Sequence, residues 1–269
     1  MKHLSILLGL FFLFSPSVFA SDEELSHFSS LLAESFQAYD GVKDYKAVFL
    51  KREESKGVLG EQETLFIKFE KPFKIFLHWF DTHRKGLQVF YERGRHGGKL
   101  AIHQPGLLLG LAPVIFLEQS SPWVRKGSEL YDIEDAGIGT FLEDFSEMVQ
   151  KGIEEKKIDV KLSSTDEGTD ADVSFPGTQQ GGDYFAWRVE AFFDAKTKLP
   201  VRMRLYDWSG KVTGIYEYKD LRLNVGTEDT EFKKIAERAL YRLFIPRLPS
   251  GETGSKVIQQ NNFSARRAS

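Results

Sequence analysis

The sequence predicts an α+β fold: a strongly curved antiparallel sheet of about ten strands that forms a half-open β-barrel, with helices packed on its concave side. Three observations predict this architecture. Many short segments alternate apolar and polar residues, which is typical of antiparallel strands that turn one face to a core. Only a few segments have the spacing of an amphipathic helix. Strands and helices do not alternate along the chain, which argues against doubly wound and TIM-type folds.

The composition limits the classes of function. With 41% hydrophobic residues, the 269-residue chain can bury a core, and we expect one domain over residues 21–245 and a disordered tail over residues 246–269. The 36 basic and 39 acidic residues nearly balance, so no nucleic-acid partner is expected. The chain has no cysteine, which excludes thiol catalysis, zinc–thiolate and iron–sulfur sites, disulfides and a lipid-modified cysteine.

The first twenty residues are predicted to be a cleaved signal peptide. Lys2 is followed by an apolar run over residues 4–14, then by Pro16 and by small residues that end at Ala20. The run is too short to span a bilayer, which needs roughly 20 apolar residues. We therefore expect a periplasmic protein that is soluble and carries no lipid anchor.

The elements before residue 106 are expected to be one helix and a series of strands. The helix is predicted over residues 21–39, where Leu25, Phe28 and Leu32 lie on one apolar stripe. Alternation with a period of two then predicts strands over residues 45–50, 65–69, 73–79, 87–91 and 100–102. Short strands joined by brief turns indicate an antiparallel meander.

The middle of the chain breaks this pattern. Residues 106–117 are apolar but contain two glycines and a proline, so we expect a loop there rather than a regular strand or helix. A central helix is predicted over residues 138–149, with Asp135 as its N-cap and Gly152 as its stop.

Strands resume in the last part of the chain. They are predicted over residues 158–162, 185–193, 201–205 and 212–223, with polar loops at 163–172 and 176–183. A short basic amphipathic helix is predicted over residues 232–244. Such a helix packs on the barrel or makes transient contact with an anionic membrane surface.

Several segments resemble LolA-like periplasmic proteins. They are FDAKTKLPVRMRLYDWSGK at Phe193–Lys211, YEYKDLRLN at Tyr216–Asn224 with Asp229 and Phe232 behind it, DYKAVFLKRE at Asp44–Glu53 and IFLHWF at Ile75–Phe80. The set is similar to an uncharacterised bacterial envelope family near LolA. The resemblance implies a half-closed barrel, lidded by helices, that carries lipids or lipoproteins. It also implies an inner-membrane exporter or an outer-membrane acceptor as partner.

The main candidate site is an apolar cavity on the concave face. Its expected lining alternates along the strands: Tyr45, Phe49, Ile67, Phe69, Ile75, Leu77, Trp79, Val89, Tyr91, Trp187, Val189 and Met203. An ordinary filled core explains the same alternation. Large apolar residues also occur at the intervening positions, so both faces of some strands must be covered, or one face must hold a ligand: Phe66, Phe76, Phe80, Phe90 and Phe192.

Two further segments are candidates for contacts. The apolar loop is expected to act as a lid or a partner contact, unless it is tucked into the core, through Leu107, Leu108, Leu109, Leu111, Ile115 and Phe116. The glycine-rich turn with Arg93, Arg95 and Lys99 is a candidate contact for a lipid headgroup, or a simple hairpin turn. We expect no metal site and no cofactor, because His78, Asp81 and His83 straddle a turn.

Three functions remain open. The first is a non-enzymatic periplasmic binder or carrier of a lipid, an acyl chain or a lipoprotein. The second is a structural or regulatory interaction module of the envelope, with a closed core and the apolar loop as its docking surface. The third is a hydrolase of envelope polymers; it has the least support, because the sequence lacks the common hydrolase motifs.

Overall fold

A computed structural model of the chain describes residues 22–105, 114–122, 132–180 and 184–226. The predicted signal peptide, the helix at 232–244, the C-terminal tail and most of the apolar loop lie outside these residues.

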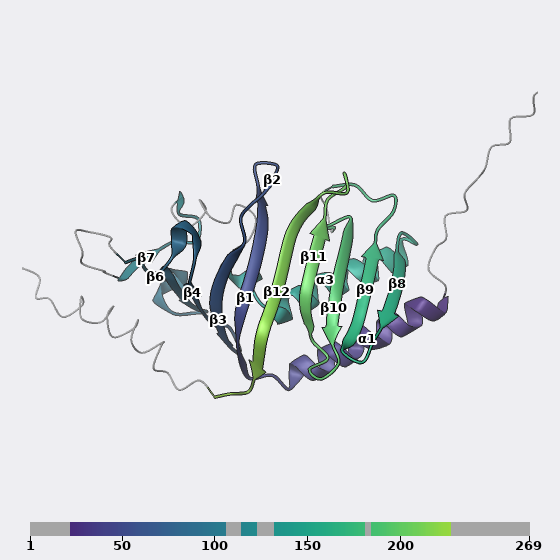
Figure 1. Cartoon of the computed structure of the whole chain (residues 1–269), viewed down its shortest axis with the longest axis horizontal. Helices are drawn as coiled ribbons and strands as arrows, with labels where there is room; N and C mark the ends of the chain where they lie inside the picture. The colour runs from purple at the N-terminus through teal and green to yellow at the C-terminus, as the bar shows by residue number, and fades with distance from the viewer. Residues whose placement is uncertain (1–21, 106–113, 123–131, 181–183, 227–269) are drawn as a thin grey trace, which may run out of the picture.

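One antiparallel sheet of twelve strands forms the body of the molecule (Figure 1). The strands before the central helix are β1 (Asp44–Ser55), β2 (Val58–Leu59), β3 (Glu63–Glu70), β4 (Lys74–Trp79), β5 (Gln88–Glu92), β6 (Leu100–His103) and β7 (Val114–Leu117). Those after it are β8 (Asp159–Ser164), β9 (Gly168–Ser174), β10 (Arg188–Asp194), β11 (Pro200–Tyr206) and β12 (Val212–Leu223).

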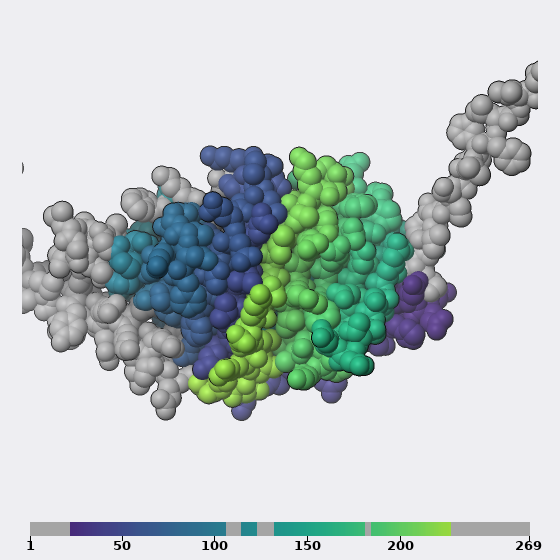
Figure 2. Space-filling model, in the orientation of Figure 1, coloured from purple at the N-terminus to yellow at the C-terminus, as the bar shows by residue number. Residues whose placement is uncertain are grey.

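The order of the strands joins two meanders. It runs β7-β6-β5-β4-β3-β1-β12-β11-β10-β9-β8, and β2 pairs with β1 outside this path. β1 and β12 meet in the middle, with Tyr45 opposite Leu223, and Figure 2 shows this seam between the two halves of the sheet. Among the described strands, β7 and β8 are the two ends of the order, so the curved sheet does not close into a barrel. The expected α+β fold with a half-open, antiparallel barrel is confirmed.

Two helices pack on the concave face of the sheet. α1 (Asp22–Asp40) contacts β8 and the central helix α3 (Ile138–Glu154), and α3 contacts β11. Figure 1 shows both helices on the side of the β8–β12 meander. Short 3₁₀ helices lie at η1 (Thr82–Arg84), η2 (His96–Gly98) and η3 (Ile133–Asp135).

The core lies between the helices and the sheet. Phe28 of α1 and Phe145 of α3 are fully buried and meet edge to face, with ring centroids 5.9 Å apart. Because every third or fourth residue of a helix shares a face, Leu142, Met148 and Val149 join Phe145 in this layer.

A second, smaller cluster lies on the outer face of β4–β7. It contains the buried residues Phe76, Phe90, Ala101 and Val114, with Phe66 packed against it. Phe80 and Phe192, which the sequence places at the same intervening positions, lie outside this cluster. Phe192 is buried beneath the guanidinium of Arg202, which lies 4.0 Å from its ring centroid, whereas Phe80 is 45% exposed.

Three expectations about local structure were wrong. Residues 114–117 form strand β7. All four residues are apolar, because Val114 is buried in the outer cluster and Ile115 faces the pocket, so the sequence shows no alternation there. Residues 168–174 form β9 rather than a loop, since Asp172 lies on its outer face and pairs with Arg188 at 2.6 Å. Asp135 does not cap α3, because its carboxylate accepts the Asp132 N–H within η3.

Candidate functional site

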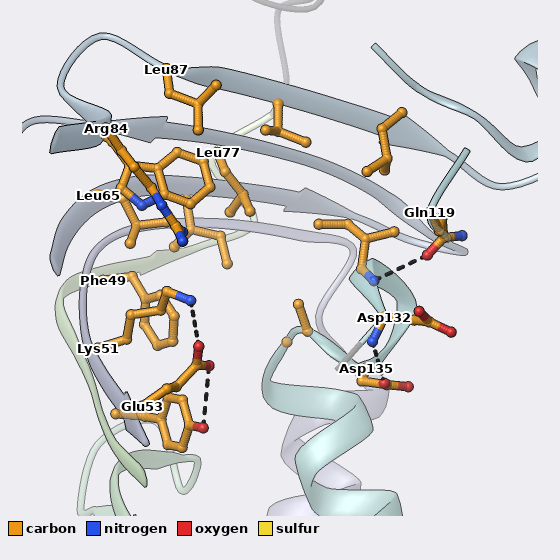
Figure 3. Close-up of a pocket in the computed structure, with 18 of the residues that line it drawn as sticks. Phe49, Lys51, Glu53, Leu65, Leu77, Arg84, Leu87, Gln119, Asp132 and Asp135 are labelled. Carbon is orange, nitrogen blue, oxygen red and sulfur yellow. Dashed lines mark hydrogen bonds and ion pairs between the residues drawn. The ribbon is translucent and has the colours of Figure 1, made fainter. Parts of the chain in front are cut away.

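A large apolar pocket lies on the concave face of the sheet, beneath β3–β7 and beside the start of α3 (Figure 3). Its volume is about 830 Å³, which falls in the upper part of the range of roughly 300–1,000 Å³ for small-molecule sites. One wall consists of aliphatic side chains at alternate positions of five strands: Leu65, Ile67, Leu77, Val89, Leu100, Ile102, Ile115 and Leu117.

The opposite side of the pocket is built from β1, β11 and β12, from η3 and from the start of α3. Phe49, Tyr216 and Tyr218 form an aromatic group, with the rings of Phe49 and Tyr218 4.6 Å apart. Met203 and Leu205 of β11 continue this side, and Ile133, Ala136, Gly137 and Phe141 complete it from η3 and α3. The pocket therefore spans the seam between the two halves of the sheet.

Charged residues enter the wall of the pocket where β1 continues past Phe49. Lys51 and Glu53 occupy the next two inward positions, and the Lys51 Nζ lies 2.8 Å from the Glu53 carboxylate. The Tyr216 hydroxyl donates a hydrogen bond of 3.3 Å to the same carboxylate. Lys51 also lies 3.8 Å from Glu63 of β3. Figure 3 shows Lys51 and Glu53 beside Phe49 in the cavity wall.

Glu63 joins this group to the next part of the wall. Its Oε2 accepts a hydrogen bond of 2.9 Å from the Trp79 indole N–H and lies 3.3 Å from an Arg84 Nη1. The four charged side chains, Lys51, Glu53, Glu63 and Arg84, are only 13–18% exposed. We call these four residues the charged quartet.

The 3₁₀ helix η3 is fastened to the sheet at the edge of the pocket. The Tyr91 hydroxyl and the Arg93 guanidinium both bond to the Glu134 carboxylate, the latter at 3.0 Å. The bond from Tyr91 lowers the pKa of Glu134 below its usual value of 4.5. Burial and the same carboxylate raise the pKa of Tyr91 to about 12. On the far side, the Ile133 N–H donates to Gln119 at 3.2 Å.

This fastening predicts an acid-sensitive contribution to stability. Since the pKa of Glu134 is lower in the folded state, the contribution is complete above the unfolded value near 4.5 and is lost as the pH falls through the folded value. Glu134→Gln is expected to lower the free energy of unfolding at pH 7 by up to about 1 kcal/mol. Below pH 4.5 the difference from the wild type shrinks. Urea unfolding at a series of pH values tests this; a difference that does not change with pH contradicts it.

The structure places six of the predicted cavity residues in the lining of the pocket: Phe49, Ile67, Leu77, Trp79, Val89 and Met203. The other six lie elsewhere. Phe69, Ile75 and Val189 are packed in the core, and Trp187 lies half-buried just before β10.

Two of these other residues support the pocket from outside. Tyr45 is fully buried against Phe69, with ring centroids 5.1 Å apart, and its hydroxyl accepts the Ile138 N–H at 3.3 Å at the start of α3. Tyr91 binds Glu134 as described above.

The predicted lid is described only at its end. Ile115 lines the pocket, whereas Phe116 is on the other face of β7, 37% exposed, with its ring 4.8 Å from that of His96. Leu107, Leu108, Leu109 and Leu111 lie outside the described residues.

The basic turn has acidic neighbours. Arg93 pairs with Glu134 at 3.0 Å, Arg95 with Glu92 at 3.1 Å and Lys99 with Glu118 at 3.2 Å. All three cations lie outside the pocket lining. Arg93 fastens η3 to the sheet through Glu134, and the other two ion pairs lie at the connection between β5 and β6. Among the described residues, no group of three or more potential metal ligands occurs.

Sequence reasoning did not select the charged quartet. Lys51 and Glu53 had a signal, because they continue the odd-numbered inward positions of Tyr45, Ala47 and Phe49. Glu63 likewise precedes Leu65 and Ile67 on the inward face of β3. Arg84 had none, since it lies in η1 and reaches the pocket only through the fold.

A family model described as "Protein of unknown function (DUF1571)" matches residues 42–241. No curated protein matches the chain. Within the described residues, no helix has the length and apolar character needed to cross a membrane.

Three solved structures illustrate what this chain is similar to, all at low sequence identity. A LolA superfamily protein from Nitrosomonas europaea is 10% identical, over 73% of this chain and 93% of that chain, with a TM-score of 0.32. A DUF1329 family protein from Desulfovibrio piger is 13% identical, over 79% and 98%, with a TM-score of 0.39. A chain of the MucA/MucB complex of Pseudomonas aeruginosa is 15% identical, over 77% of this chain and 59% of that chain, with a TM-score of 0.43.

Proposed function

The chain belongs to the DUF1571 family, and we propose that it is a periplasmic, non-enzymatic carrier of a lipid, an acyl chain or a lipoprotein. The observation that carries this proposal is the apolar pocket of about 830 Å³ under the sheet. An envelope transporter that delivers the ligand, or a membrane acceptor that receives it, would be the partner.

The energetics of the pocket suit an acyl chain. Each methylene moved from water into an apolar site contributes about 0.8 kcal/mol. Fifteen methylenes therefore contribute roughly 12 kcal/mol. Against an association cost of about 4 kcal/mol or more, up to about 8 kcal/mol remains, which corresponds to a micromolar Kd. A long chain is sufficient for useful affinity without any chemical step, and the remaining affinity is low enough to permit transfer.

The alternatives have less support. A module with a closed core requires no cavity, although the exposed Phe116 beside the apolar loop suits a protein contact. The support for a hydrolase stays weak, because Glu53 and Glu63 are both paired with cations and the sequence lacks the common hydrolase motifs.

Ile115→Asp is expected to weaken ligand binding at least tenfold. A carboxylate in the apolar wall must be desolvated when an acyl chain enters, and a tenfold loss corresponds to only about 1.4 kcal/mol. The measurement is titration with the neutral fluorescent probe N-phenyl-1-naphthylamine, together with native mass spectrometry of lipids that remain bound after purification. Phe116→Asp is the matched control, because its side chain lies one position away on the outer face of β7. Equal losses in the two variants, or no binding by the wild type, would contradict the proposal.

A further inference from the structure

We propose that the pocket accepts an amphiphile with a zwitterionic head group, a cationic ammonium joined to an anionic phosphate, seated on Lys51, Glu53, Glu63 and Arg84. This inference rests on the proposed function and assigns the chemistry of the ligand's polar end.

The charged quartet is a costly feature in an apolar wall. Ion pairs that are mostly removed from water lose hydration that their mutual attraction barely recovers, and apolar side chains of similar size are often more stable in the same place. β1 carries Phe49 at the preceding inward position, so an apolar continuation was open to this strand. Binding specificity explains why two cations and two carboxylates are found instead.

The quartet is exposed to a ligand on one side. Lys51, Glu53 and Arg84 belong to the pocket lining, while Glu63 lies behind them and holds Lys51 and Arg84 at 3.8 and 3.3 Å. Figure 3 shows Arg84 extending into the same part of the cavity as Lys51. A head group at this point meets both signs of charge within one layer of side chains.

The aliphatic wall begins directly beside the quartet. Glu63 is followed on the inward face of β3 by Leu65 and Ile67, and Ile67 pairs across the sheet with Leu77 of β4. An amphiphile with its head at the quartet therefore has its tail along Leu65, Ile67 and Leu77. On both β1 and β3 the inward residues change once between charged and apolar. This change sets where the head of the ligand lies and in which direction its tail runs.

The charge balance favours a zwitterion over an anion. The quartet is neutral overall. Lys56 adds one positive charge to the lining, and the opposite side of the pocket adds the carboxyl groups of Asp132, Asp135 and Asp144. Partial desolvation and, after it, the neighbouring carboxylates of Asp135, Glu147 and Glu143 raise the pKa of Asp144. A purely anionic head would meet cations that already have partners. A zwitterion meets both signs of charge, with its phosphate at Lys51 and Arg84 and its ammonium at Glu53, while Glu63 stays behind them as the partner of both cations.

The test compares two lysolipids with the same acyl chain, both below their micelle concentrations. Lysophosphatidylethanolamine is zwitterionic and lysophosphatidylglycerol is anionic, and each displaces N-phenyl-1-naphthylamine from the wild-type protein. We expect the zwitterion to bind about tenfold more tightly at low ionic strength, a difference of about 1.4 kcal/mol. Equal affinity, or tighter binding of the anion, overturns the inference while leaving the proposed function intact. If neither lysolipid nor the neutral probe binds, the proposed function itself fails.

Two variants test the residues. Glu53→Gln leaves Lys51 with less negative charge, so it is expected to remove the preference by strengthening binding of the anionic lysolipid. The double variant Lys51→Met with Glu53→Gln deletes one ion pair without leaving an unpaired charge, which protects the fold, and should also reduce the preference to less than about threefold. Lys196→Met, at an exposed turn, is the control and should keep the wild-type ratio. An unchanged ratio in the double variant excludes the quartet as the head-group site.

Discussion

Replacing Phe145 with alanine is expected to lower the free energy of unfolding by about 3–5 kcal/mol. Phe145 is fully buried at the centre of the layer between α3 and the sheet. Its ring is stacked on Phe141 at 5.3 Å and meets Phe28 of α1 edge to face. Its removal leaves a cavity that neither helix can close without losing contact with the sheet, and equilibrium unfolding in urea measures the loss.

The same substitution should also disorder one side of the candidate pocket. Phe141 and the residues before α3 line the cavity, so a loosened helix removes one of its sides. Phe116→Ala is the control, since this ring is partly exposed on the outer face and its removal should cost less than about 1 kcal/mol. A loss of unfolding free energy below about 2 kcal/mol for Phe145→Ala would mean that the packing of α3 on the sheet contributes little to the stability of the core.

Replacing Gly168 with alanine is expected to cost at least 3 kcal/mol, about as much as a large deletion in the core. Gly168 begins β9 at a φ of +157° and lies opposite Asp194. A Cβ at this position would overlap the backbone carbonyl oxygen of Phe193 and lie 2.7 Å from the Phe192 ring. Because a backbone carbonyl in a strand cannot move without breaking its ladder, the two strands must separate locally.

Gly177→Ala separates crowding from backbone strain. Gly177 also has a positive φ, +75°, but a Cβ there would meet no atom within 4 Å. We expect this control to lose about 1–2 kcal/mol from the left-handed conformation alone. Similar losses for the two variants, compared by thermal or urea unfolding, would show that the β9–β10 pair adapts to the added methyl group.

Most of the architecture could be predicted from the sequence because one face of the sheet is buried throughout. The alternation of Ile75, Leu77 and Trp79 on β4 follows directly from that burial. Prediction failed where this condition changed. β7 is apolar at every position because both of its faces have contacts. β9 was missed for another reason: it keeps one buried face, with Ala171 and Val173, but the aspartates of its outer face resemble a polar loop.

The candidate site was predictable only in part, for a similar reason. Alternation identifies inward residues but does not separate those that touch a helix from those that face a cavity. Ile75 and Leu77 lie two positions apart on one face, yet only Leu77 lines the pocket. Ile75 is fully buried in the core, and the point at which the core gives way to the pocket is set by the fold and not by the alternation. Arg84 enters the site from a short 3₁₀ helix, and no periodic pattern predicts its direction.

The seam between β1 and β12 governs the order in which the molecule is completed. Tyr45 lies opposite Leu223, and the Asn224 side chain bonds to the backbone of Lys43 at 2.7 Å and of Gly41 at 3.0 Å. A chain that emerges from its N-terminus therefore keeps one edge of β1 unsatisfied until nearly the whole domain has followed. Closing so long a loop is slow, and the waiting edge is open to strands of other chains. A product truncated anywhere before β12 is thus expected to aggregate rather than fold.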